Sequence, residues 1–254
     1  MQTTMPSCAC GRNAANIRRM NRIGASIAVI GIIAAASTTA VAAGAEAPCV
    51  PDQHQSFICG TGQGAIRVFP ETIAPSGKLA FGWRTSKGLP SGASEPSGAV
   101  ENVLIRLPDG AVLGTLGSTY WASGEMRANR RDLIAAWSPD SRAVVEVENS
   151  RWETESLRFH GIGDGDVVSL DLRDLVERAV SQAAGGAAKG RVFRVREDLP
   201  VKLDSGGHLS FAAILFFPKS EEAALGFRLE LMVKTVRSSA AARVVSIQRA
   251  KLPN

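Results

Sequence analysis

The sequence predicts a mainly β protein made of three repeated antiparallel β-meander units, with one helix near residues 172–184. Three observations carry this prediction. A turn between two alternating apolar segments occurs three times, and its residues Ser76, Asp140 and Asp204 are 64 positions apart in each case. Each interval has room for a second hairpin, which gives each unit about four strands. One stretch shows the apolar period of a helix.

The central turn is the clearest of the three. Trp137 ends an apolar run, Pro139 fixes φ, and Asp140 has a side chain that accepts hydrogen bonds from nearby backbone amides. Alternation then resumes through Val147. We therefore expect residues 137–147 to form a strand, a tight turn and a second strand.

The remaining strands are expected from the same pattern. Turns are expected at 75–78, at 108–110 and at 163–166, and the Asp-Gly steps of the last two favour tight hairpins. In the last part of the chain, Arg228, Glu230 and Lys234 alternate with apolar residues, so one face is expected to be buried and the other wet. The further expected strands are 67–69, 79–84, 102–107, 111–116, 157–160, 167–170, 192–195, 209–217, 226–236 and 242–248.

The predicted helix runs from Leu172 to Ala184. Asp171 precedes it as a candidate cap, and Gly185 and Gly186 end it. Its apolar residues recur at helical spacing, so we expect one face of the helix to pack across the sheets. These residues are Leu172, Leu175, Val176, Ala179 and Val180.

Residues 1–47 are expected to be a signal peptide, followed by a single β-rich domain at 48–254. An arginine cluster precedes residues 23–45, which carry no charge and end in small residues. Cleavage after Ala43 and after Ala47 both fit, and Met20 is an alternative start. The other interpretation is an uncleaved transmembrane anchor, which would be the chain's one contact with a membrane. Export makes the expected location periplasmic or secreted.

Cys49 and Cys59 are expected to form a disulfide. They are the two cysteines left after cleavage, and they lie at the new N-terminus in an oxidising compartment. The alternative is a redox pair, or a metal site that includes His54. Their spacing lacks the close pairs typical of zinc ligands and of redox motifs, so we expect no metal and no cofactor.

The charge of the chain argues against nucleic acid as a partner. The net charge is +5, but residues 1–47 hold four arginines and one glutamate, which leaves 25 basic and 23 acidic groups in the rest. A nearly balanced domain lacks the basic footprint that nucleic-acid binding requires.

The central turn carries a resemblance to a known family. Ser138-Pro139-Asp140-Ser141-Arg142, followed by alternating valines, resembles the Ser-Pro-Asp-Gly-Lys turn of WD-repeat-like blades in bacterial periplasmic β-propellers of the Tol-associated type. The segment 75–81 is similar, and 203–211 is a third copy without the proline. The resemblance implies blade-like units and a role as a binding scaffold, and it implies no catalytic residue. Because blades repeat every 40 to 45 residues or so, a β-sandwich stays as the alternative architecture.

The segment 117–132 is the predicted binding surface. Aromatic residues beside arginines are typical of protein-binding hot spots and of anion or sugar contacts. The alternative is that the aromatic pair closes one end of the core while the arginines are solvated or paired with Glu125 and Asp132. The residues predicted to bind a ligand or partner are Tyr120, Trp121, Arg127, Arg130 and Arg131.

The function predicted from these features is that of an exported, non-catalytic envelope protein, which acts as a binding or scaffolding module for an envelope protein or a small ligand. The sequence contains none of the common hydrolase, metalloprotease or nucleotide-binding motifs. The alternative is an exported hydrolase in which the fold brings His160 or His208 to a serine and a carboxylate. A homo-oligomer that completes a ring from several three-unit chains is a further expectation.

Overall fold

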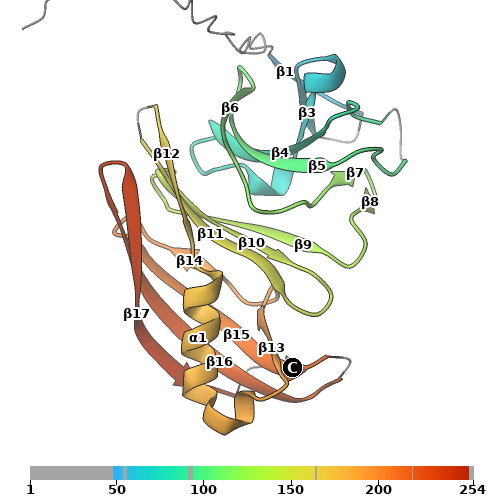
Figure 1. The fold of residues 1–254 in the computed structure, drawn as a ribbon. Coiled ribbons are helices and arrows are strands. Elements are labelled where there is room, and N and C mark those ends of the chain that lie inside the picture. The colour runs from blue at the N-terminus through green and yellow to red at the C-terminus, as the bar shows by residue number, and fades with distance from the viewer. Residues whose placement is uncertain (1–47, 54–55, 91–93, 164, 219, 252–254) are drawn as a thin grey trace, which may run out of the picture. The chain divides into compact units, whose positions relative to one another are not determined.

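The computed structural model describes residues 48–53, 56–90, 94–163, 165–218 and 220–251, which belong to one compact unit (Figure 1). The expected signal peptide at 1–47 lies outside the described residues, as does His54. Among the described residues, no helix has the length and apolar character needed to span a bilayer.

The N-terminal sheet has its strands in sequence order, β1-β2-β3-β4-β5-β6, with every neighbouring pair antiparallel. Its strands are β1 (Cys49–Pro51), β2 (Phe57–Cys59), β3 (Ile66–Val68), β4 (Leu79–Thr85), β5 (Val100–Arg106) and β6 (Ala111–Thr115). Short 3-10 turns lie at Gly62–Gly64 and Pro70–Thr72. Cys49 and Cys59 face each other across β1 and β2 and are bonded, which confirms the expected disulfide.

The middle sheet is an antiparallel meander in the order β12-β11-β10-β9. Its strands are β9 (Asp132–Trp137), β10 (Ala143–Asn149), β11 (Thr154–Ile162) and β12 (Val167–Asp171). The expected central hairpin is confirmed, because Ser138 and Ala143 close the turn with a backbone hydrogen bond of 2.9 Å. A two-stranded ribbon, β7 (Ala122–Ser123) and β8 (Met126–Arg127), precedes β9.

The C-terminal sheet has the order β13-β15-β16-β17, with β14 also paired to β15. Its strands are β13 (Val192–Val195), β14 (Lys202–Leu203), β15 (His208–Phe217), β16 (Ser220–Val236) and β17 (Ser239–Arg249). The expected alternation along β16 is confirmed, because Leu229, Leu231 and Val233 are buried whereas Arg228, Glu230 and Lys234 are exposed.

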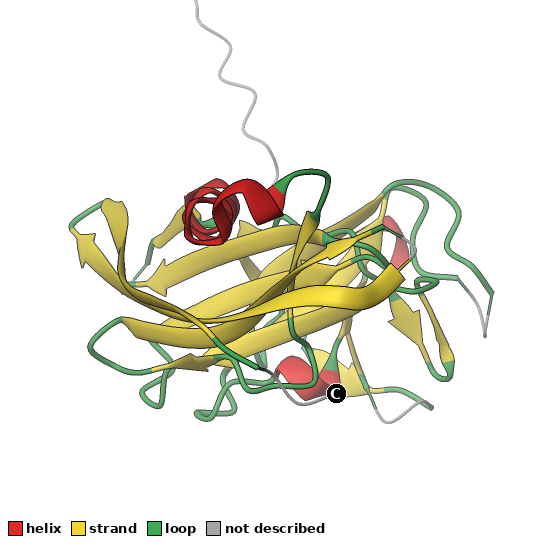
Figure 2. Ribbon diagram, turned by 90° about the horizontal axis from the view of Figure 1, so that it is seen from below, coloured by secondary structure: helices red, strands yellow, loops and turns green. Residues whose placement is uncertain are grey.

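The middle and C-terminal sheets share one apolar core. Val145, Val147 and Phe159 of the middle sheet pack in the same cluster as Phe211 and Phe227 of the C-terminal sheet. The helix α1 (Arg173–Ala184) adds Leu172, Val176 and Val180 to this core and contacts β11 and β17 (Figures 1 and 2). The predicted helix and its buried face are therefore confirmed.

The opposite face of the middle sheet packs against the N-terminal sheet. Val144 of β10 lies in a second cluster with Phe81 and Trp83 of β4. Trp137 donates its indole hydrogen to the carbonyl of Thr72 at 2.7 Å. The middle sheet is therefore covered on both faces, and residues 144–149 of β10 are all buried.

The mainly β class, the antiparallel sheets and the helix are confirmed by this arrangement. The described residues form no closed barrel and no propeller. The repetition of three blade-like units accordingly stays a prediction.

Candidate functional site

The five residues of the predicted binding surface lie in different environments. Tyr120 is buried, at 5% exposure, and its ring packs against that of Phe69 with centroids 5.4 Å apart. Trp121 is half-buried and its ring lies 6.3 Å from that of Trp83. Both aromatic residues pack in the core under the N-terminal sheet, Tyr120 as a buried side chain and Trp121 with part of its surface exposed.

The three arginines of the segment point to different neighbours. Arg127 is 64% exposed, and its guanidinium lies 3.8 Å from the carboxylate of Asp132. Arg131 donates to Glu148 at 2.7 Å and to the hydroxyl of Thr119 at 3.0 Å. Arg130 is exposed and forms no salt bridge with a described residue.

Arg130 and Arg131 line a shallow depression of about 390 Å³, which we call the arginine–tryptophan surface. It forms between the loop before β9 and the turn after β10. Since these strands are antiparallel neighbours, with Asp132 opposite Asn149, the start of β9 and the end of β10 lie at the same end of the sheet. The lining residues are Asn129, Arg130, Arg131, Ser150, Arg151, Trp152, Glu153 and Glu155.

Residues 150–155 of this surface were not part of the sequence prediction. Arg151 places its guanidinium carbon 4.4 Å above the ring of Trp152, in the geometry of a cation–π contact. A signal for it was present in the sequence. Once the central turn is fixed, extending the hairpin in register brings Arg130 opposite Arg151.

The electrostatics of the surface leave two guanidinium groups available. Glu153 is paired with Arg173 at 2.9 Å, and Arg131 is paired with Glu148. Arg130 and Arg151 have no acidic partner among the described residues. Arg130 also has a φ of 55°, a conformation that costs energy for a residue with a Cβ and that clusters at functional sites.

Two buried carboxylates hold the segment 117–119 in place. Glu146 accepts the amide hydrogens of Gly117 and Ser118 at 3.1 and 2.7 Å, and Glu148 accepts that of Thr119 at 3.2 Å. Burial raises the pKa of Glu148 above its ordinary value even though Arg131 acts in the opposite direction. The segment that carries Thr119, whose hydroxyl accepts a hydrogen bond from Arg131, is thus fixed by buried carboxylates.

Comparisons with models of protein families, with curated proteins and with solved structures returned no match. The resemblance to Tol-associated blades therefore stays an expectation from the sequence. Function has to be argued from the chemistry of the chain itself.

A second group of interest connects β10, β11 and β12. The Nε2 atom of His160 lies 3.0 Å from Glu146, and its Nδ1 atom lies 2.8 Å from the hydroxyl of Ser169. Burial opposes the ionisation of Glu146, but the hydrogen bonds from His160 and the Gly117 amide outweigh it and lower its pKa. An ionised Glu146 takes the hydrogen of Nε2, so the lone pair of Nδ1 accepts the Ser169 hydroxyl.

This serine, histidine and glutamate have the order of a nucleophile, a base and an orienting carboxylate. Ser169 is exposed on the edge strand β12, whereas His160 and Glu146 are buried. His208 lies on another sheet, 3.8 Å from Glu230. Among the described residues, no group of three or more histidine, cysteine, aspartate or glutamate side chains is placed to hold a metal ion.

Proposed function

We propose that this chain is an exported, non-catalytic module of the cell envelope that binds a protein partner through its arginine–tryptophan surface. The observation that carries the proposal is the meeting of residues 129–131 with residues 150–155 in one depression. Two exposed arginines without acidic partners and one tryptophan come together there. Arginine and tryptophan are the residue types that contribute most to protein-binding hot spots.

The charges of the surface indicate the chemistry of the partner. Arg130 and Arg151 are both unpaired, so a carboxylate of the partner can bind each without displacing an existing salt bridge. Guanidinium groups bind carboxylates with two parallel hydrogen bonds. An acidic segment with an apolar side chain for Trp152 fits these groups.

Export, the blade-like repetition and self-association belong to the same proposal. The Cys49–Cys59 disulfide is of the kind that persists in oxidising compartments. The first two repeated turns are in contact, because the amide of Ser76 donates to the hydroxyl of Ser141 at 3.0 Å. A ring of several copies would extend this repetition, and mass measurement in solution tests it directly.

A paired substitution tests the binding surface. Arg130→Ala combined with Arg151→Ala should weaken binding of an envelope partner by roughly tenfold or more, as expected for the loss of hot-spot contacts. The matched control is Arg228→Ala with Arg243→Ala, which removes the same charge from exposed positions outside the depression. Partners recovered from envelope extracts would be quantified for each protein. The proposal is contradicted if both double variants recover the same amount of partner, or if Arg130→Ala with Arg151→Ala recovers as much as the natural protein.

The second candidate function is hydrolysis, which the Ser169–His160–Glu146 chain favours. In such a reaction, His160 would accept the hydroxyl proton as Ser169 attacks an ester carbonyl, and would then return it to the departing alcohol. A fluorophosphonate probe tests this. Labelling that maps to Ser169 and disappears in His160→Gln supports hydrolysis. Labelling that is the same in Ser169→Ala as in the control variant Ser246→Ala supports the binding module.

A further inference from the structure

A cavity of about 870 Å³, which we call the mouth, opens at the other end of β9 and β10 from the arginine–tryptophan surface. Its walls come from segments that are far apart in the sequence, including two of the three repeated turns. These segments are 138–143, 161–163, 165–166, 204–207 and 233–237. Pockets of this size accept small ligands, and the open ends of β structures are common places for them.

The floor of the mouth is the end of the core shared by the middle and C-terminal sheets. Phe159 and Val233 belong to this core and line the cavity, together with Val168 of β12. Gly161 takes the next inward position after Phe159, and a Cβ there would lie 2.9 Å from the hydroxyl of Thr235. Because this inward position carries no side chain, the core ends at Phe159 and the cavity begins beyond it.

One side of the mouth carries two carboxylates that the turns hold in place. One oxygen of Asp140 accepts the Ser138 hydroxyl at 2.7 Å, and these turn hydrogen bonds lower its pKa. One oxygen of Asp204 accepts the amides of Gly206 and His208, both at 2.8 Å. Neither carboxylate forms a salt bridge with a described residue.

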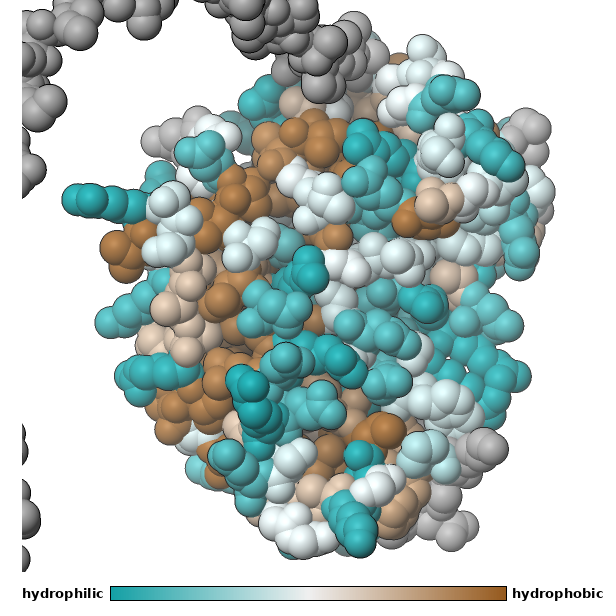
Figure 3. All heavy atoms as spheres, in the orientation of Figure 1, coloured by the Kyte–Doolittle hydropathy of each residue, from teal (hydrophilic) through white to brown (hydrophobic). Residues whose placement is uncertain are grey.

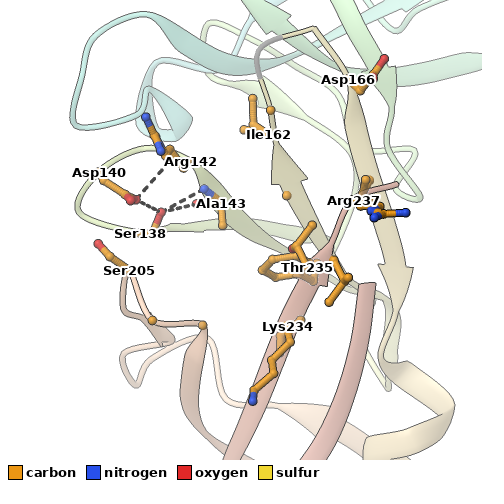
Figure 4. A pocket seen from close by; sticks show the side chains of 18 of the residues that line it. Ser138, Asp140, Arg142, Ala143, Ile162, Asp166, Ser205, Lys234, Thr235 and Arg237 are labelled. Carbon is orange, nitrogen blue, oxygen red and sulfur yellow. Dashed lines mark hydrogen bonds between the residues drawn. The ribbon is translucent and has the colours of Figure 1, made fainter. Parts of the chain in front are cut away.

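The other side of the mouth carries a cation. Arg237 lies across from Asp140 and Ser205, with Ile162 and Thr235 between them (Figure 4). It also has no salt bridge with a described residue. Lys234 lines the same cavity, but its side chain points away from the other labelled groups. Arg142, next to Asp140 in the same turn, and Asp166 also line the mouth, so its wall carries charges of both signs, and Asp140, Asp204 and Arg237 form no salt bridge with one another.

The wall of the mouth also carries an exposed apolar side chain. Val236, which lines it, is 64% exposed. Hydrophobic residues gather on the side of the molecule where β12 and the β16–β17 hairpin lie (Figure 3). A ligand with an apolar body would bury these side chains and gain about 25 cal/mol for each Å² removed from water.

We propose that the mouth binds a small zwitterionic ligand with an apolar body. Its ammonium group would lie between Asp140 and Asp204, its anionic group would bind Arg237, and its apolar part would rest on Phe159 and Val168. Two sources share this chemistry, a short apolar peptide with free termini and a zwitterionic lipid of the phosphoethanolamine type. The site is separate from the arginine–tryptophan surface, so the two proposals succeed or fail independently.

Calorimetric titration of the purified protein with trileucine tests the proposal, and lysophosphatidylethanolamine below its micelle concentration forms the second arm. We expect saturable binding of one of them at a single site. For trileucine, acetylation of the amine and amidation of the carboxylate should each weaken binding by about tenfold, the loss expected for one exposed charge-assisted contact. Triglycine, which lacks the apolar body, should not bind measurably.

Variants then assign each charge to its partner. Asp140→Asn with Asp204→Asn should weaken the binding of free trileucine about tenfold, and acetylation of its amine should then have no further effect. Arg237→Gln should likewise weaken binding, and amidation of the carboxylate should then have no further effect. Arg243→Gln, which removes an exposed cation of β17 outside the mouth, is the matched control and should bind normally. Thr235→Phe fills the mouth and should abolish binding, with its melting curve showing that it is folded.

Three results would overturn the proposal. The first is an absence of saturable binding in both arms, and the second is equal binding of free, acetylated and amidated trileucine. These two need no variant, so a failure of folding cannot produce them. The third is unchanged binding by Thr235→Phe. If only the lipid binds and the charge variants weaken it, the proposal stands with the lipid as its source.

Discussion

Replacing Glu146 by glutamine tests the buried carboxylate that holds the 117–119 segment and accepts a hydrogen bond from His160. The Glu146 side chain has no exposure to solvent and accepts three hydrogen bonds, from Gly117, Ser118 and His160, at 3.1, 2.7 and 3.0 Å. Glutamine has one acceptor oxygen in place of two. If that oxygen keeps the hydrogen bonds from Gly117 and His160, the NH₂ group of the glutamine faces the Ser118 amide, so two hydrogen-bond donors face each other without an acceptor.

The expected cost follows from this count. One buried hydrogen bond to a charged acceptor is lost, which is worth roughly 1.5 to 3 kcal/mol, and the Ser118 amide is left unsatisfied. We expect Glu146→Gln to lower the free energy of unfolding by about 2 to 3 kcal/mol. For a domain of this size the melting temperature should fall by about 4 to 12 °C.

Urea unfolding followed by tryptophan fluorescence measures the change. The matched control is Glu101→Gln, because Glu101 is 41% exposed and pairs with Arg84 at 2.7 Å. Exposed pairs contribute little, so this control should lose no more than about 0.5 kcal/mol. A loss for Glu146→Gln that equals the control would refute the view that this carboxylate holds the 117–119 segment.

Three further predictions concern the same structure. The pKa of Glu146 is lowered in the folded state, so its ionised form stabilises the protein above its unfolded pKa of about 4.3, and this contribution is lost as the pH falls through the lower folded value. The free energy of unfolding should therefore fall less steeply with acid in Glu146→Gln than in the natural protein, and identical slopes would contradict this. Arg131→Ala leaves Glu148, which is 2% exposed, without its cation, so we expect the free energy of unfolding in urea to fall by about 1 to 3 kcal/mol. Adding Glu148→Gln should restore most of this free energy, and an equal loss in the double variant would argue against the pair. Gly207→Ala should lower the melting temperature by more than about 6 °C, because the glycine has a φ of +82° and a Cβ would lie 2.1 Å from the carbonyl oxygen of Val233. An unchanged melting temperature of this variant would contradict the prediction and show that the turn adjusts easily.

Much of the local structure could be predicted from the sequence because its causes are local. Pro139 and Asp140 restrict the backbone at the central turn whatever surrounds it, and the strands on both sides follow from alternation. The helix follows from its apolar period, since Val176 and Val180 are one turn apart on one face. The Cys49–Cys59 pair follows from the small number of cysteines and their position in the chain.

The candidate sites could be predicted only in part. Arg130 and Arg131 were identified from their composition and do line a depression, but Tyr120 from the same segment is a core residue. An aromatic side chain beside arginines has the same sequence pattern whether it closes a core or meets a partner. Whether another element covers it decides between the two, and that element is far away in the sequence.

The sequence by itself determined where this chain turns, which segments are strands or helix, and which residues alternate between two faces. The tertiary structure decided what covers each face. Alternation along β10 puts Glu146 and Glu148 on the same face as Val144, and two charged residues would usually make that face a wet one, yet the segment 117–119 closes over them. Periodicity depends on backbone geometry, which is local, whereas burial depends on contacts between distant segments, which only the packed sheets supply.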